Sequence, residues 1–381
     1  MRIKASYFER GKELYRQLHR VPELGFDLPK TVAIVKSELS ALGIAYTEKY
    51  GKSSVVAEIG KGEKTVALRA DMDALPVEEK TDLPFASEIP GRMHACGHDA
   101  HTAILLSVAA YLKSVEEKLP VRVRLIFQPS EECSESGARM MVEHGVMEVV
   151  DHIVCTHCEN TLESGKIGVC EGDYMAACVP LRIRFLGKTA HAALREEGVD
   201  AIAMSVSAYS RMEEAVASLS SGAPYIWSVG RFSGGTAHNV VCDACEMDIS
   251  FRFFDLAFAE RVREAVYSIC EQIAGEYGGR VEIDWHMSTA PVHNDAGVVK
   301  AFVAAASAHG IAVERVKRRM TSEDFAWYLT RAKGMLFRVG TKNERKGCTA
   351  LAHCNDFKID EDGIETAIKA FVAYILGDAE M

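Results

Sequence analysis

The segment MHACGHDAHTA, residues 93–103, concentrates side chains of the types that bind metal ions. Cys96, His98, Asp99 and His101 lie close together in it, and a glycine separates the first two. A thiolate and an imidazole two residues apart can face one ion if the backbone turns at that glycine, and such donors suit zinc, iron, cobalt or nickel better than magnesium. Burying several titratable groups without a shared partner is costly. The segment therefore predicts a metal site rather than packed core or surface.

Further donor groups lie near the ends of predicted strands. They are Asp71 and Asp73, Glu131 and Glu132, and His157, which is predicted to end its strand. In open α/β sheets, sites form beyond the carboxyl ends of strands, so these distant groups can converge. Each also has an ordinary explanation: the aspartates as turn or helix-capping residues, the glutamates as a solvated acidic pair, and the histidine as a packed strand residue. Their shared placement favours one site.

Alternating strand and helix signals must position these groups. The predicted elements are helices at 8–18, 102–112 and 139–148, and strands at 66–68, 121–127 and 153–155. They follow from apolar spacings of three and four residues in the helices and of two residues, or short apolar runs, in the strands. This βαβ pattern predicts an α/β sheet with helices on both faces.

A different pattern runs from about residue 179 to Pro291. Its predicted elements are a strand at 180–186, a helix at 200–219, strands at 226–232 and 240–254, a helix at 256–277 and a strand at 281–285. This β-α-β-β-α-β order is that of a ferredoxin-like two-layer module. Since 381 residues exceed what one core normally organises, we expect two domains. Residues 1–178 and 292–381 would form the catalytic domain, with residues 179–291 inserted into it.

The amino-acid composition limits the classes of molecule that the protein is expected to bind. The net charge is −10 and the charges are interspersed, which argues against nucleic acid or an anionic membrane and favours a small-molecule ligand. The first residues lack a signal-peptide core, and the apolar stretch 104–112 is too short to span a bilayer. The 11 cysteines are scattered, as in reduced cytosolic proteins. We expect a cytoplasmic protein.

Two C-x-x-C pairs, Cys155/Cys158 and Cys242/Cys245, could form a four-thiolate zinc site. They lie much further apart than the roughly 15 to 20 residues of a compact zinc ribbon. If these stretches are strands, positions i and i+3 point to opposite faces, so neither pair is a natural chelate.

A series of motifs resembles that of the dinuclear-metal amidohydrolase and metallopeptidase family of aminoacylase, hippurate hydrolase, N-acetyldiaminopimelate deacetylase and indoleacetyl-amino-acid hydrolase. The resemblance covers nearly the whole chain. Its motifs are HRVPELGF (19–26), LRADMDALPV (68–77), MHACGHDAHTA (93–103), FQPSEE (127–132), THCENTLESGKIG (156–168), GKTAHAA (187–193), GGTAHNVV (234–241), TSEDFAWY (321–328) and AHCNDFKIDEDGI (352–364).

The resemblance implies a zinc-peptidase-like three-layer α/β catalytic domain and an inserted ferredoxin-like lid that often forms homodimers. It also implies a centre of two divalent ions (Zn, Mn, Co or Ni), which would lower the pKa of a shared water. The metal ligands carried over are Cys96, His98, Glu132, His157 and His353.

Other roles follow from the same resemblance. Glu131 is then the general base that takes the proton of the water, and His191 would stabilise the oxyanion together with the metal. Asp73 is interpreted, like Asp99, as orienting ligand imidazoles.

Asn239 and Arg252 are candidates for substrate contacts. The ordinary alternatives are a surface position for His191, a hairpin position for Asn239 and a strand-edge ion pair for Arg252.

The chain departs from many relatives at Cys158-Glu159-Asn160, where an apolar residue and then a proline are common, and at Lys188-Thr189-Ala190, where glycines are common. No donor is lost, but such neighbours help to shape the pocket for the acyl group.

The leading hypothesis is hydrolysis of the amide of an N-acyl amino acid to a carboxylic acid and a free amino acid. A dipeptidase or carboxypeptidase is the enzymatic alternative, and a metal-dependent binding protein on the same scaffold is the non-enzymatic one. Glu131 discriminates between them, because a binding protein has no need of an unliganded carboxylate beside Glu132.

Overall fold

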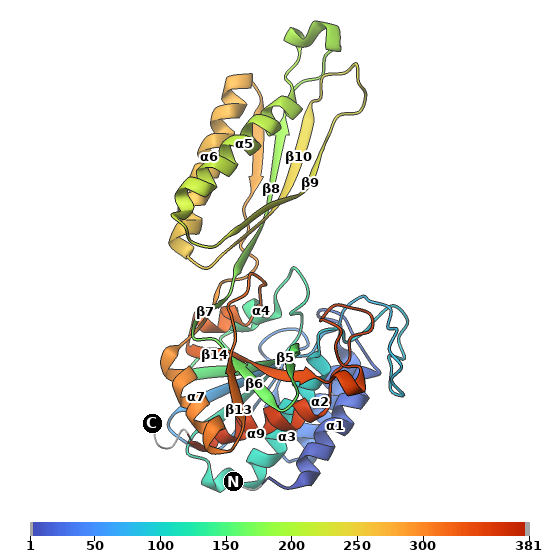
Figure 1. Ribbon diagram of the computed structural model, residues 1–381, viewed down its shortest axis with the longest axis vertical. Coiled ribbons are helices and arrows are strands. Elements are labelled where there is room, and N and C mark those ends of the chain that lie inside the picture. The colour runs from blue at the N-terminus through green and yellow to red at the C-terminus, as the bar shows by residue number, and fades with distance from the viewer. Residues whose placement is uncertain (1–2, 378–381) are drawn as a thin grey trace. The chain divides into compact units, whose positions relative to one another are not determined.

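The computed structural model describes residues 3–377, which divide into two compact units (Figure 1). The first unit runs to Tyr174, continues through Val292–Arg318 and resumes at Asp324. The second comprises Met175–Pro291 and the short segment Arg319–Glu323. Each unit has its own apolar core.

An eight-stranded mixed sheet organises the first unit, in the order β1-β2-β4-β3-β5-β14-β6-β13. Its strands are β1 (Tyr46–Thr47), β2 (Val55–Ile59), β3 (Thr65–Asp71), β4 (Arg122–Gln128), β5 (His152–Glu163), β6 (Lys166–Val169), β13 (Ala312–Arg315) and β14 (Lys333–Lys342). Strands β4, β3, β5 and β14 run parallel, so their carboxyl ends lie on one edge. A separate two-stranded sheet pairs β7 (Gly172–Met175) with β12 (Val292–Asn294).

Helices cover this sheet. They are α1 (Ala5–His19), α2 (Pro29–Ala41), α3 (His98–Ser114), α4 (Gly137–Glu143), α7 (Ala296–Ala308), α8 (Ala326–Leu329) and α9 (Asp362–Gly377). Helix α3 packs against α1, α9 and β3, and α4 packs against α8 and β4. The predicted mixed α/β class is confirmed. Within residues 3–377, no helix combines the length and the apolar character needed to cross a bilayer.

The second unit has one antiparallel four-stranded sheet, ordered β11-β8-β10-β9. Its elements are β8 (Ala177–Leu186), α5 (Ala201–Ser220), β9 (Ile226–Gly234), β10 (Ala244–Phe253), α6 (Leu256–Tyr277) and β11 (Arg280–Asp284). Alternate residues of β8 and β10 are buried, and both helices contact this sheet (Figure 1). The predicted β-α-β-β-α-β order is confirmed.

Some predicted boundaries are wrong. His157 does not end its strand, because β5 continues to Glu163 and pairs with β14 over most of that length. Helix α3 begins at His98, four positions before the predicted start, because Gly97 takes a left-handed conformation with φ of 88° and ends the preceding loop there. The change of direction at this glycine makes His98 the first helical residue.

Candidate metal centre

The five predicted metal ligands come together in the first unit. Cys96 Sγ lies 3.3 Å from His157 Nε2. Glu132 Oε1 lies 3.7 Å from His98 Nε2 and 3.4 Å from His353 Nε2. Two trios, Cys96 with His98 and His157, and Cys96 with Glu132 and His353, each have all their ligand atoms within 4.8 Å of one another. The donors thus form one cluster with Cys96 shared by two groups.

Unusual backbone conformations present these side chains. Left-handed φ angles occur at Gly97 (88°), Ser130 (53°) and His353 (70°), each at or next to a donor residue. A Cβ atom at Gly97 would lie only 3.1 Å from the Cβ of Cys158, so a side chain there would strain both the conformation and the packing. The His353 N–H donates to the Ala95 carbonyl at 2.7 Å, which ties its loop to the cysteine segment. Strain of this kind concentrates at functional sites.

Asp73 accepts hydrogen bonds from the backbone of both Glu131 and Glu132. Its Oδ1 accepts the Glu131 N–H at 2.9 Å and its Oδ2 accepts the Glu132 N–H at 3.1 Å. The same Oδ1 lies 3.4 Å from His98 Nδ1. The buried carboxylate of Asp73 therefore fixes the backbone of both glutamates and also lies near Nδ1 of His98, the ring nitrogen that does not face Glu132.

The electrostatics of the cluster fit a cation. Burial, with the charge of Glu132, raises the pKa of the Cys96 thiol well above its ordinary value. Burial, with Arg338 nearby, lowers the pKa of His157, so its imidazole is neutral and free to act as a ligand. Burial opposes ionisation of Glu132, but the neighbouring His353 outweighs it and the pKa of Glu132 falls. A cation would add the positive charge that a Cys96 thiolate needs.

One buried nitrogen of the cluster is available to bind a metal ion. His98 Nε2 is fully buried and makes no hydrogen bond within the described residues. Its contacts with Asp71 Oδ2 and Glu132 Oε1 are both 3.7 Å, too long for hydrogen bonds. An orphaned buried nitrogen is costly unless a metal or water satisfies it. Thiol, imidazole and carboxylate donors around such an atom fit a transition-metal ion.

Asp99 does not face a donor imidazole in this way. Its Oδ2 lies 2.6 Å from Nδ1 of His19, whose Nε2 lies 3.2 Å from Glu79 Oε1. All three side chains are almost completely buried. Burial alone would lower the pKa of His19, but the bonds to the two carboxylates outweigh it and raise that pKa to about 9. No signal in the sequence pointed to this triad, because its members are far apart in the chain.

Asn160, noted in the sequence only as part of the departure at residues 158–160, has a structural role near the donor cluster. Its Nδ2 donates to the carbonyls of Ala350 (2.8 Å) and Lys358 (3.0 Å), at the two ends of the exposed loop that carries His353. Its Oδ1 accepts from the Thr341 hydroxyl at 2.6 Å. This buried amide closes the base of the loop.

Two predicted residues of the second unit lie on adjacent loops. His191 and Asn239 are exposed, and the Ala192 N–H donates to the Asn239 carbonyl at 3.0 Å. Nδ1 of His191 accepts the Ala193 N–H at 3.1 Å, which leaves Nε2 of the ring for another partner.

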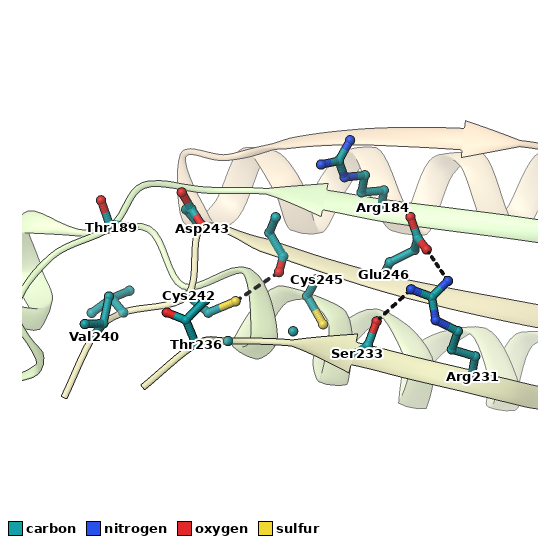
Figure 2. A pocket seen from close by; sticks show the side chains of 14 residues that line it. Arg184, Thr189, Arg231, Ser233, Thr236, Val240, Cys242, Asp243, Cys245 and Glu246 are labelled. Carbon is teal, nitrogen blue, oxygen red and sulfur yellow. Dashed lines mark hydrogen bonds and ion pairs between the residues drawn. The ribbon is translucent and has the colours of Figure 1, made fainter. Parts of the chain in front are cut away.

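A pocket of about 390 Å³ lies beside these loops in the second unit, with Thr189 and Val240 on its wall (Figure 2). Arg231 within it is paired with Glu246 at 2.8 Å.

Arg252 lies on β10 of the same unit. Its Nη1 donates to the Met320 carbonyl at 3.0 Å and to the Ser322 hydroxyl at 3.1 Å. These bonds fix the plane of the guanidinium. The alternative of a strand-edge ion pair finds no support among its hydrogen bonds, which go to neutral groups.

The two C-x-x-C pairs divide between the units, with Cys155 and Cys158 in the first and Cys242 and Cys245 in the second. None of the four forms a disulfide within residues 3–377.

Comparison with known proteins agrees with this arrangement. Residues 67–377 match the profile of Peptidase family M20/M25/M40. N-acetylcysteine deacetylase of Bacillus subtilis is 35% identical over 371 residues, covering 96% of each chain. Thermostable carboxypeptidase 1 of Saccharolobus solfataricus is 35% identical over 356 residues, covering 92% of this chain and 90% of that protein. The crystal structure of the Bacillus subtilis YXEP protein, described as a dinuclear metal binding peptidase from the M20 family, is 32% identical, covers 99% of each chain and gives a TM-score of 0.86. The predicted zinc-peptidase-like fold is confirmed.

We expect Asn160→Ala to loosen the loop that carries His353. The substitution removes the donor to two partly buried carbonyls, and the upper limit of the cost is the roughly 1–3 kcal/mol of a fully buried unsatisfied group. Hydrogen exchange of the amides between residues 350 and 358 should therefore accelerate, while exchange in β3 and β4 stays slow. Thr341→Val is the matched control, because it removes only the hydroxyl that donates to the amide oxygen and should change the loop much less. Unchanged exchange in Asn160→Ala would show that other contacts hold the loop.

The His19 triad predicts a pH dependence of stability. Because the pKa of His19 rises from 6.5 to about 9 on folding, its contribution is complete below pH 6.5 and is lost as the pH rises to about 9. At about 1.4 kcal/mol per pKa unit, the contribution is of the order of 3 kcal/mol. The thermal unfolding midpoint should fall across this window, and His19→Gln should flatten the fall, whereas the exposed His309→Gln should not. An NMR titration midpoint for His19 near 6.5 would contradict this account.

Proposed function

The chain belongs to Peptidase family M20/M25/M40, and we propose that it is a metal-dependent amidohydrolase that cleaves N-acyl amino acids into a carboxylic acid and a free amino acid. The observation that carries the proposal is the convergence of thiol, imidazole and carboxylate donors around Glu132, with Glu131 beside them. A relative named N-acetylcysteine deacetylase, similar over 96% of its length, supports an N-acyl amino acid as the substrate class.

We propose that the cluster binds two divalent ions. The ligands would be Cys96, His98, Glu132, His157 and His353. The orphaned Nε2 of His98 supports this assignment, as does the dinuclear metal binding described for a structural relative. The mixed sulfur, nitrogen and oxygen donors are compatible with Zn, Mn, Co or Ni.

When bound, such ions polarise an amide carbonyl and lower the pKa of a water toward neutrality. Glu131 would accept the proton of this water and later deliver it to the leaving amine. Asp73 contributes by holding the Glu131 backbone N–H at 2.9 Å, which limits the positions that the base can adopt. His191 would donate from Nε2 to the carbonyl oxygen as negative charge develops there.

Arg252 and Asn239 would bind the free carboxylate of the substrate. The guanidinium of an arginine is a planar cation whose donors match the two oxygens of a carboxylate. Nη1 of Arg252 is already oriented by Met320 and Ser322, so little side-chain entropy remains to be lost on binding.

We also propose that residues 179–291 form an inserted lid and a homodimer interface. Strand β9 is one of the two edges of the four-stranded sheet, and Phe232 on it is 41% exposed. An open edge with an exposed aromatic side chain suits pairing with a second copy. The absence of any disulfide among the 11 cysteines in the described part of the chain supports a reducing compartment such as the cytoplasm.

A carboxypeptidase or dipeptidase is the second candidate, because thermostable carboxypeptidase 1 is similar over 92% of this chain. Both activities use a metal centre and a carboxylate contact, so only the substrate separates them. The proposed base Glu131 argues against a protein that only binds its ligand.

A substrate panel tests the function. Metal-free protein is reconstituted with Zn, Mn, Co or Ni and supplied with N-acetyl, N-benzoyl and indoleacetyl amino acids beside simple dipeptides. We expect the best N-acyl amino acid to exceed every dipeptide by about tenfold or more in kcat/KM, a difference of about 1.4 kcal/mol. Hydrolysis of dipeptides alone would favour the peptidase, and metal binding without any hydrolysis would favour the binding protein.

Glu131→Gln and Glu132→Gln should differ in what they lose. Without its base the first variant should lose about 10²- to 10⁴-fold in kcat, with metal content and KM nearly intact. The second removes a ligand charge and should lose metal. Metal analysis and steady-state kinetics on both proteins decide this, with Cys96→Ala as a second variant expected to lose metal. Identical behaviour of the two glutamine variants would contradict the separate roles.

Arg252→Ala should abolish the preference for a free carboxylate. Loss of a charge-assisted contact of about 1.5–3 kcal/mol corresponds to roughly 10- to 150-fold in kcat/KM for an N-acyl amino acid, but little for its carboxamide. His191→Ala should instead lower kcat for both substrates, because its partner is the developing oxyanion. If the unmodified enzyme uses both substrates equally, the carboxylate contact does not exist.

A further inference from the structure

His101 connects a buried carboxylate to the strand that carries His157. Its Nδ1 lies 2.6 Å from Asp71 Oδ1, and its Nε2 accepts the Cys158 N–H at 2.9 Å. All of these side chains are buried. Because Nε2 accepts a hydrogen bond, the ring proton must be on Nδ1, where Asp71 accepts it. The two contacts therefore select one tautomer of His101.

The bond to Cys158 bears on the next residue along the strand. The Cys158 carbonyl accepts from Nδ1 of His157 at 2.7 Å, and Nε2 of that ring faces Cys96 Sγ at 3.3 Å. His101 thus accepts a hydrogen bond from the N–H of Cys158. The carbonyl of Cys158 in turn sets the tautomer and the ring plane of His157. A shift of this backbone would turn the nitrogen that faces the donor cluster.

Asp71 is itself immobilised. Arg69 Nη1 donates to its Oδ2 at 2.6 Å, and its backbone carbonyl accepts from the Thr102 hydroxyl at 2.9 Å. A different assignment would make Asp71, His98 and His101 a metal-binding trio, since their ligand atoms lie within 4.8 Å of one another. However, both carboxylate oxygens of Asp71 already accept hydrogen bonds, and both ring nitrogens of His101 already have partners. The hydrogen bonds therefore favour a supporting role for the Asp71–His101 pair.

We propose that His101 is a positioning residue that, together with Asp71, fixes the backbone of Cys158 and thereby the ring plane and tautomer of His157. The inference rests on the proposed function only in taking His157 as a metal ligand. Its consequence is that His101 sets the affinity for the ion bound by His157 without contacting that ion. Partners that orient ligand imidazoles typically contribute about 10- to 100-fold in metal affinity.

Two substitutions separate this role from simple packing. His101→Gln keeps an acceptor near the position of Nε2, whereas His101→Met fills similar space without one and leaves the Cys158 N–H unpaired. His309→Met is the matched control, because that histidine is exposed and its ring contacts the Ala305 carbonyl of the helix that it follows, away from the donor cluster. Zn²⁺ affinity is measured on the full-length metal-free protein by competition with a chromophoric chelator, which resolves the two dissociation constants.

We expect His101→Met to weaken one of the two Zn²⁺ dissociation constants about 10- to 100-fold, His101→Gln to weaken it less, and His309→Met to leave both unchanged. The second readout needs no metal. In ¹⁵N-histidine NMR spectra of the metal-free protein, His157 should be the Nδ1–H tautomer in the wild type and a mixture of tautomers in His101→Met.

Wild-type zinc affinities in both His101 variants, with an unchanged His157 tautomer, would overturn the proposal. Loss of one whole zinc equivalent in both variants, again with an unchanged tautomer, would make His101 a ligand and also overturn it. A failure of the proposed function looks different. If no N-acyl amino acid is hydrolysed, the zinc and tautomer pattern still holds, and if the wild type binds no zinc, the NMR spectra alone decide the positioning role.

Discussion

Burial of many ionisable side chains at the carboxyl ends of parallel strands is the constraint on which the first unit depends. Each such group must be neutralised or hydrogen-bonded, since an isolated buried charge is prohibitive. Arg69 meets this requirement by pairing with Asp71 at 2.6 Å and with Asp324 at 2.9 Å, and His19 meets it by bridging Asp99 and Glu79. Near Cys96, by contrast, the buried atoms His98 Nε2 and Glu132 Oε1 have no hydrogen-bond partner within the described residues, and a cation there would satisfy both.

The surrounding structure stabilises the strained backbone conformations that occur at the donor cluster. Non-glycine residues in the left-handed region, such as Ser130 and His353, cost of order 1–3 kcal/mol each, and they persist only where their surroundings determine them. Ser130 donates to the Glu135 carbonyl at 2.7 Å, and the loop of His353 is bound at both ends by Asn160. Burial of the apolar core of the first unit contributes the stabilising free energy that offsets this strain. Loops around the centre can therefore hold strained conformations without unfolding the unit.

Local patterns predicted much of the fold and the donor residues, while long-range contacts decided the rest. Helix α6 spans the predicted 256–277, because Asp255 caps its start and Gly278 its end, signals that lie in the adjacent sequence. The density of donors in residues 93–103 was equally local. The end of β5, in contrast, depends on pairing with β14 from a distant part of the chain, and the partners of His19 and Asn160 are distant as well. No spacing rule predicts such pairs. The individual roles of the donor residues followed from family resemblance rather than from spacing.

The departure at Cys158-Glu159-Asn160 illustrates how a position near a site can act without touching a substrate. These three residues were expected to influence the acyl pocket, yet all are at most 6% exposed. Cys158 packs against Gly97 and receives the bond to His101, Glu159 accepts from the N–H and hydroxyl of Thr161, and Asn160 closes the His353 loop. Their polar groups are occupied by the protein itself. Changes at Cys158 and Asn160 would therefore act through the orientation of His157 and through the loop of His353.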